Sequence, residues 1–256
     1  MCDHPSPVPV IEKAGRILML TLWVSMLAGA TSGFGKDKQS DLGPFPDPTG
    51  KVQTFTAQGS IDTESPFFKS LGTNGRSCST CHQPSDGWTV TPPHIQDRFN
   101  ATGGTDPIFR LNDGATCDKQ DVSTVAARRD AYSLLLRKGL IRIALPIPAN
   151  AEFSVTGISD PYGCSTAAEL SVYRRPLPST NLPFLSTVMW DGRETAPGKS
   201  IHDDLISQAR DATLGHAQAA QSPTDEQLAQ IVSVELALFT AQVFDAAAGR
   251  LDARGA

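Results

Sequence analysis

Apolar residues recur at helical spacing towards the C-terminal end of the chain. Residues 224–227 read Thr-Asp-Glu-Gln, a capping box that predicts the start of a helix. The apolar residues that follow are three or four positions apart: Leu228, Val232, Leu236, Phe239 and Val243. The pattern therefore predicts one long amphipathic helix that continues to about Asp245.

Further helices are expected upstream. Helical spacing and turn residues predict them over about 201–214, over 125–140, from Pro92 to about 99, and as a short piece near 64–71. Ser and Thr stand before the first and third of these and are suited to capping. The chain is thus expected to be mainly α-helical, with long loops.

Two stretches depart from the helical pattern. Between 140 and 178, short and partly alternating runs predict a small hairpin or meander, within an insertion at about 101–178. Residues 31–57 include Gly-Pro-Phe-Pro-Asp-Pro and are expected to form an extended arm with no regular element. The remaining domain then covers 58–256.

The N-terminus has the pattern of an export signal. Lys13 and Arg16 precede an apolar run at 17–27, which ends in Ala-Gly-Ala. This order of a basic region, an apolar stretch and small residues is typical of a cleaved signal peptide. The run is shorter than the ~20 apolar residues that a membrane helix needs. Residues 1–30 are therefore predicted to be removed, which leaves a periplasmic or secreted protein without a membrane span; an uncleaved anchor is the alternative.

The composition limits the classes of partner. The formal net charge is −5, and no basic cluster is present, so a nucleic-acid partner is not expected. The chain contains 19 Pro and 21 Gly, which favours much loop and a core that needs another apolar component.

The most specific chemical motif is Cys78-Ser-Thr-Cys81-His82, the attachment pattern of a c-type haem. On a helical turn all three side chains share one face. The thiols can then form thioethers with the two vinyl groups of one porphyrin, and His82 can bind the iron as its proximal ligand. We therefore expect one covalent haem c. Half of a zinc site would need further ligands, and a thioredoxin-like pair would need a βαβ context that the sequence does not show.

Two other cysteines remain in the mature chain. With Cys78 and Cys81 bound to haem, Cys117 and Cys164 are free to form a disulfide in an oxidising compartment. The alternative is a pair of unbonded, buried thiols.

In the order of its motifs the chain resembles the bacterial di-haem cytochrome c peroxidase family, which includes the maturation enzymes of methylamine dehydrogenase. After its Cys-x-x-Cys-His, that family has a segment close to Arg-x-x-Pro-x-Leu, then Phe-Trp-Asp-Gly-Arg, then a helix with Gln-Ala. The matching segments here are Arg175–Ser179, Met189–Arg193 and Gln208-Ala209. The resemblance covers about 58–250 and implies a cytochrome-c-like helical domain that carries the peroxidatic haem.

The resemblance also implies an activity and roles for residues. It implies reduction of hydrogen peroxide with electrons from a small redox donor, a cytochrome c or a cupredoxin. Trp190 matches the family's electron relay, and His94 matches its distal iron ligand, for which Met189 is a rival. The family's catalytic Glu beyond Gln-Ala is missing, and His216 is the expected substitute.

Other positions follow from the chemistry of a haem. The arginines expected to pair with its propionates are Arg174, Arg175 and Arg193. Trp88 is expected either against the porphyrin or in the core. The family's second haem motif does not occur before Ala256, so a partner carrying a second haem is expected, or a truncated, inactive fragment. A non-enzymatic mono-haem electron-transfer cytochrome c is the further alternative.

Overall fold

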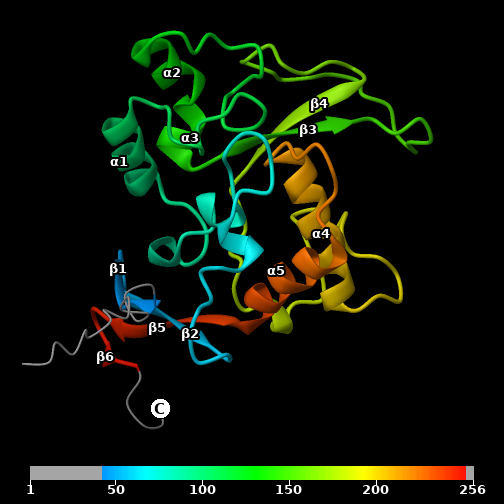
Figure 1. Ribbon diagram of the computed structural model, residues 1–256. Coiled ribbons are helices and arrows are strands. Elements are labelled where there is room, and N and C mark those ends of the chain that lie inside the picture. Colours follow the sequence, from blue (N-terminus) through cyan, green and yellow to red (C-terminus); the bar gives the residue numbers. More distant parts are fainter. Residues whose placement is uncertain (1–41, 252–256) are drawn as a thin grey trace, which may run out of the picture. The chain divides into compact units, whose positions relative to one another are not determined.

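The computed structural model describes residues 42–251, so the predicted signal peptide lies outside the described residues (Figure 1). About 31% of these residues are helical and 16% lie in strands, which form two antiparallel sheets. The expectation of a mainly α-helical fold is therefore wrong. The prediction fails mainly at the two ends of the described chain, which pair with each other as β-strands.

The larger sheet joins the two ends of the described chain. Its strands lie in the order β1-β2-β5-β6. The central pair, β2 and β5, is antiparallel, with Phe55 opposite Phe239. The expectation that 42–57 has no regular element is thus also wrong, while 31–41 lies outside the described residues. The strand bounds are Phe45–Asp47 for β1, Gly50–Thr56 for β2, Leu238–Asp245 for β5 and Gly249–Arg250 for β6.

The C-terminal helix α5 (Asp225–Ala237) begins where the sequence predicts but ends earlier. The Thr224 hydroxyl accepts from the Gln227 backbone N–H at 3.2 Å, and the Gln227 side chain accepts from the Thr224 N–H at 2.9 Å. From Leu238 the backbone is extended. The residues that follow are rich in β-branched and aromatic types, which suit a strand, and β2 offers them a backbone partner.

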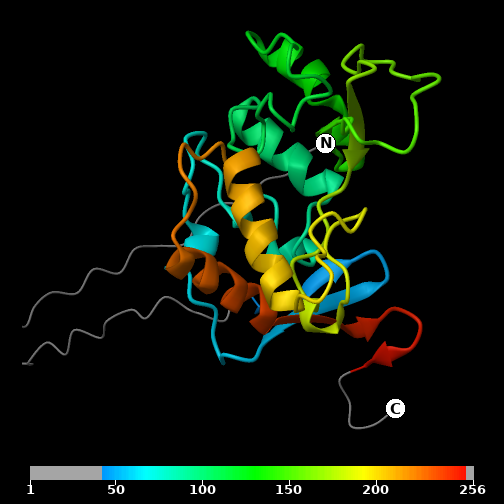
Figure 2. The same cartoon turned by 90° about the vertical axis from the view of Figure 1, so that its right-hand side faces the viewer.

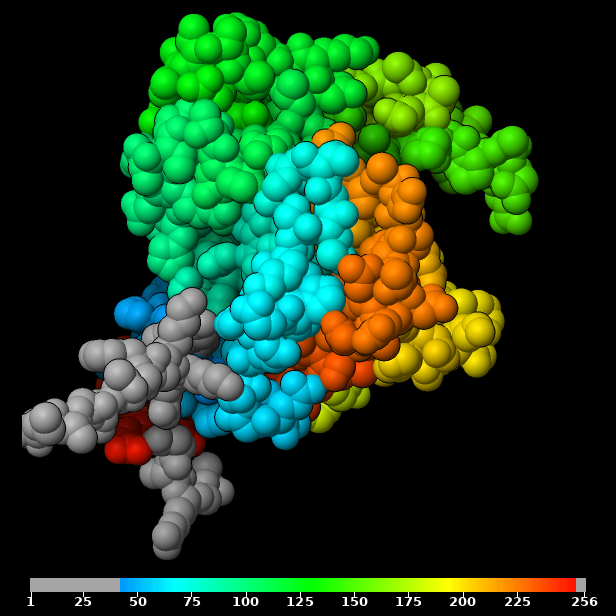
Figure 3. Space-filling model, in the orientation of Figure 1, coloured from blue at the N-terminus to red at the C-terminus, as the bar shows by residue number. Residues whose placement is uncertain are grey.

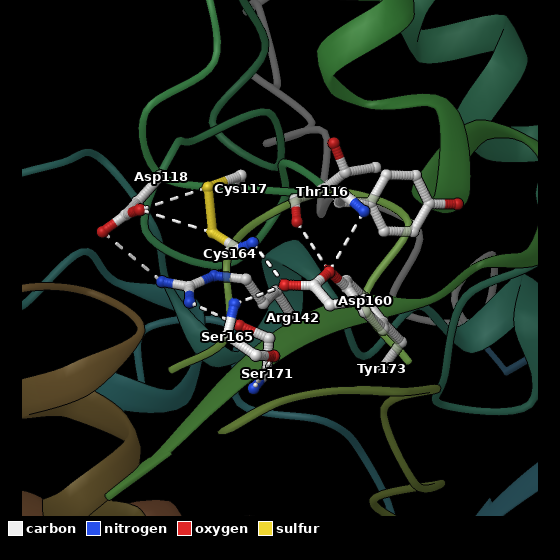
Figure 4. Close-up of a disulfide and its surroundings, with 10 residues drawn as sticks. Thr116, Cys117, Asp118, Arg142, Asp160, Cys164, Ser165, Ser171 and Tyr173 are labelled. Carbon is white, nitrogen blue, oxygen red and sulfur yellow. Dashed lines mark hydrogen bonds and ion pairs between the residues drawn. A yellow bond between two sulfur atoms is a disulfide. The ribbon is translucent and has the colours of Figure 1, made fainter. Parts of the chain in front are cut away.

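The expected hairpin between 140 and 178 is confirmed. β3 (Ile141–Pro146) pairs with β4 (Glu169–Arg174), although 153–155 forms no strand. A disulfide joins Cys164, in the connecting loop, to Cys117 (Figure 4). This bond closes a loop of 47 residues, which on chain-entropy grounds contributes about 4 kcal/mol to stability.

The other helices follow their sequence signals closely. α1 (Pro92–Thr102) begins at Pro92, and α4 (Ile201–Gly215) begins after Ser200, whose hydroxyl accepts from the Asp203 N–H at 3.2 Å. The predicted helix over 125–140 is divided into α2 (Val125–Ala131) and α3 (Ser133–Lys138). Single 3-10 turns are η2 (Pro66–Phe68), η3 (Cys78–Thr80), η4 (Pro84–Asp86) and η5 (Leu182–Phe184).

The helices surround two separate apolar cores. One contains Phe67, Trp88 and the inner faces of α4 and α5, and the other lies among α1, α2 and α3. In the two views of the ribbon, the green helices of the second core lie above the orange pair α4 and α5 (Figures 1 and 2). Cys78 packs against the first core and Cys81 against the second, so the Cys pair lies between them.

Candidate functional site

Cys78, Cys81 and His82 lie on one tight turn, as their spacing predicts. The backbone N–H of His82 donates to the Cys78 carbonyl at 3.0 Å, and that of Cys81 donates to the same carbonyl at 3.2 Å. Both thiols are free. Burial raises the pKa of each thiol, which is the opposite of what a reactive thiolate pair requires. The turn thus presents two neutral thiols and an imidazole to the same space.

The imidazole of His82 is oriented as an iron ligand would be. Its Nδ1 lies 2.9 Å from the Trp88 carbonyl oxygen, to which it donates a proton. This bond fixes the tautomer and leaves Nε2 with a free electron pair. Burial lowers the pKa of His82, although the bond to Trp88 opposes this. A neutral imidazole is the form that binds a metal.

Trp88 holds this carbonyl in place through an unusual backbone conformation. Its φ is 62°, which is rare for a bulky residue and is typical of functional sites. The indole is fully buried, donates from Nε1 to the Thr54 hydroxyl at 2.8 Å and packs against Phe67. Of the two roles left open by the sequence, core packing is therefore the one that the structure shows.

A cavity of about 190 Å³ lies beside the Cys turn. Cys78, Cys81 and His82 all line it. Most of its walls are apolar and come from both cores, from the end of α5 and from the segment before α4. The apolar lining includes Leu71, Ile141, Ile143, Leu177, Leu182, Val188, Met189, Ile201, Leu205, Ala209 and Ile231. Free thiols, a neutral imidazole and apolar walls fit a covalently attached haem.

A buried polar network borders the same cavity. Arg76 and Asp113 are almost completely buried and form an ion pair. The second oxygen of Asp113 binds His216 Nδ1 at 2.6 Å. Burial by itself would raise the pKa of Asp113, but the hydrogen bond with His216 and the charge of Arg76 lower it. Asp113 thus stays ionised and holds the Nδ1 of His216, a residue that lines the cavity.

Two of the three segments that carry this network lie side by side. The cyan segment before η3 runs against the orange segment between α4 and α5 (Figure 3). The Thr73 N–H donates to the Ala217 carbonyl at 3.1 Å, and the Asn74 amide donates to the His216 carbonyl at 2.8 Å. His216 is therefore brought to the cavity by contacts across the fold.

Trp190 and the three arginines also meet at the cavity wall. Asp191 lies 3.1 Å from Arg174 and 2.9 Å from Arg193. Burial opposes ionisation of Asp191, but bonds from Arg193 and Arg174 lower its pKa to about 2. Arg175 donates to a backbone carbonyl at 2.7 Å, and its own carbonyl accepts from Trp190 Nε1 at 2.8 Å.

His94 lies outside this group. It is on the exposed face of α1, where its Nδ1 contacts Asp86, and it does not line the cavity. The rival ligand Met189 does line the cavity and has a φ of 69°. Of the side chains considered as a sixth iron ligand, the structure brings Met189 and not His94 to the site.

Glu235 is a cavity residue that the sequence reading missed. It is 5% exposed, accepts from the Ser179 hydroxyl at 2.8 Å through Oε1, and has no hydrogen-bond partner at Oε2 among residues 42–251. The sequence could have indicated Glu235, because Leu228, Ile231 and Glu235 are spaced to lie on one face of a helix. A carboxylate on such an apolar face is unusual.

No helix within residues 42–251 is long and apolar enough to cross a bilayer. Comparisons with protein-family models, with curated proteins and with solved structures each return no match to this chain.

Proposed function

We propose that this chain is an exported c-type haem protein that reduces hydrogen peroxide with electrons from a small redox donor. The observation that carries the proposal is the common cavity of two free thiols and one oriented imidazole. The order of motifs shared with the di-haem cytochrome c peroxidases supports the peroxidase type of activity.

The residues divide into those that hold the haem and those that act on peroxide. Cys78 and Cys81 would hold it by thioether bonds, and His82 Nε2 would bind the iron. A haem bound there supplies the electron transfer that breaks the O–O bond. The arginines at the cavity wall are suited to the propionates, because a guanidinium matches a carboxylate in shape and charge.

His216 is suited to the proton transfer. Reduction of one peroxide to two waters consumes two electrons and two protons, and one proton must move to the leaving oxygen. The Asp113 carboxylate fixes Nδ1, so that Nε2 of His216 is the atom that gives and takes the proton. Asp113 acts as a positioning residue, which is a recurrent arrangement for catalytic imidazoles.

The electrons would enter through the wall that contains Trp190. This side chain is 60% exposed and also lines the cavity, so it connects the surface with the site. A donor cytochrome c or cupredoxin, or a partner protein that carries a second haem, would dock there.

A mono-haem electron carrier is the second candidate function. The position of Met189 favours it, because Met and His together on a haem iron raise the potential and suit electron transfer. In that case the iron would have no open position for peroxide.

Absorption spectra separate the two functions. The exported protein is recorded in its ferric and ferrous forms, before and after addition of peroxide. For a peroxidase we expect the ferrous form to be reoxidised, with two haems oxidised per peroxide. Low-spin spectra that peroxide leaves unchanged in both forms would reject the peroxidase and favour the carrier. In the carrier, Met189→Leu should also convert the iron to high spin.

A further inference from the structure

We infer that Glu235 is a redox-linked proton acceptor, whose carboxylate takes up one proton when the haem iron beside it is reduced. The inference rests on the proposed function. One electron passes from the donor protein to the iron and converts ferric to ferrous. One proton passes from solvent to a Glu235 oxygen, where an O–H bond forms, and oxidation reverses both transfers.

The first support is the position of the carboxyl group. Glu235 comes from the last turn of α5 and lines the same cavity as Cys78. The two groups also interact electrostatically, since the negative charge of Glu235 adds to the burial that raises the pKa of Cys78. A haem bound to Cys78 would therefore bring its iron charge into range of Glu235.

The second support is that the Glu235 carboxylate has few partners that would stabilise its negative charge. Ser179 donates one hydrogen bond, and Oε2 has no partner within 42–251. A buried polar atom without a partner is costly, and an unpaired buried charge costs more. Buried titratable groups with strongly shifted pKa values cluster at functional sites, where their protonation changes.

The groups around Glu235 do not neutralise it. The main contacts of α5 with other elements are with α4, η2 and η5, and the last two have no titratable side chain. On α4, the cavity-lining residues are uncharged, and buried Asp204 accepts from a backbone N–H at 3.0 Å. Lys69, after η2, pairs with Glu64 at 2.9 Å.

The charged side chains on the other walls of the cavity form ion pairs or hydrogen bonds with groups other than Glu235. The guanidinium of Arg76 is occupied by Asp113 and by three backbone carbonyls, and Asp113 also holds His216. The three arginines near Trp190 bind Asp191 or a backbone carbonyl. Among the described residues, no cation forms an ion pair with Glu235.

The direction of the coupling follows from charge. Burial raises the pKa of Glu235 to about 7, although the Ser179 hydrogen bond acts to lower it. Ferric haem carries one more positive charge than ferrous haem and favours the carboxylate, so this pKa is lower in the ferric protein. Between the ferric and ferrous values the midpoint potential falls as pH rises. For one electron and one proton, each tenfold change in proton concentration corresponds to about 59 mV.

The test is the midpoint potential of the haem-loaded protein, measured across roughly pH 4 to 9, which covers both the ordinary glutamate pKa of about 4.3 and the raised value. We expect the wild type to show a falling segment near neutral pH that Glu235→Gln removes. Ser179→Ala should move this segment to higher pH, because it removes the bond that lowers the pKa. Glu226→Gln, which changes an exposed glutamate on the same helix, should behave as wild type.

A second readout does not depend on the glutamine variant. The redox-difference infrared spectrum of the wild type should gain a protonated-carboxyl band on reduction. A Glu235→Gln protein that binds haem and keeps the wild-type slope, or a wild type without this band, would overturn the inference. A wild type that binds no haem would instead refute the proposed function, so the two failures are distinguishable.

Discussion

Replacing His216 with alanine is expected to slow peroxide reduction by about 10²–10⁴-fold, the usual contribution of a positioned acid or base. The haem should remain attached, because its anchors are elsewhere in the cavity. The physical reason is that His216 is the imidazole at this wall with a carboxylate fixing its Nδ1. The rate is measured by rapid mixing of the ferrous protein with peroxide.

His202→Ala is the matched control for this prediction. This histidine is on the surface of α4, is about half exposed and pairs with Asp203 at 3.6 Å, so its loss should leave the rate unchanged. Asp113→Asn should reduce the rate as well, because it changes the partner that fixes the tautomer of His216. A His216→Ala protein that reduces peroxide within about threefold of wild type would remove His216 from the mechanism, since the smallest expected effect is ~10²-fold.

Replacing Arg76 with methionine is expected to lower the free energy of unfolding by about 3–5 kcal/mol, because it leaves the buried Asp113 carboxylate without its cation. The side chain also donates to the carbonyls of Pro107 at 2.8 Å, Ile108 at 2.6 Å and His216 at 3.2 Å. Denaturant unfolding at neutral pH measures the loss.

The stability loss caused by Arg76→Met is also expected to depend on pH. The pKa of Asp113 in the folded protein is lowered, so its stabilising contribution is present above the ordinary carboxyl pKa and is lost as pH falls through the lowered value. In the Arg76→Met protein, protonation instead relieves the unpaired charge. The stability difference between wild type and variant should therefore shrink on acidification.

Two further variants test whether charge is the cause. Arg76→Met combined with Asp113→Leu should recover much of the lost stability, since an apolar pair can replace a buried ion pair. Lys69→Met, which breaks the exposed pair with Glu64, should cost at most about 1 kcal/mol. Equal losses for Arg76→Met and Lys69→Met would contradict the structural account.

Local signals predicted those parts of the fold that depend on neighbouring residues. The Ser200 cap of α4, the capping box of α5 and the start of α1 at Pro92 depend on residues a few positions apart, and the strands of the β3–β4 hairpin follow from their own alternating patterns. The turn at Cys78–His82 belongs to the same class. For this reason the side chains of Cys78, Cys81 and His82 could be placed on one face without a structure.

Features that depend on contacts between distant parts of the chain were not predicted from local sequence patterns. Residues 239–243 fit helical spacing, yet they form β5 because β2, almost 200 residues earlier in the chain, supplies its backbone partner. The distance of His94 from the Cys-x-x-Cys-His motif made it the predicted distal iron ligand, whereas in the structure its side chain is half exposed to solvent. The link between His216 and Asp113 spans 103 residues and has no local signature.

The most direct measurement is the intact mass of the exported wild-type protein, produced together with the machinery that attaches c-type haem. If haem is attached covalently, the mass should exceed that of the mature polypeptide by one haem. The Cys78→Ser, Cys81→Ser double variant should have the mass of the polypeptide alone. A wild-type protein with no added haem under these conditions would show that this cavity does not hold a covalent haem.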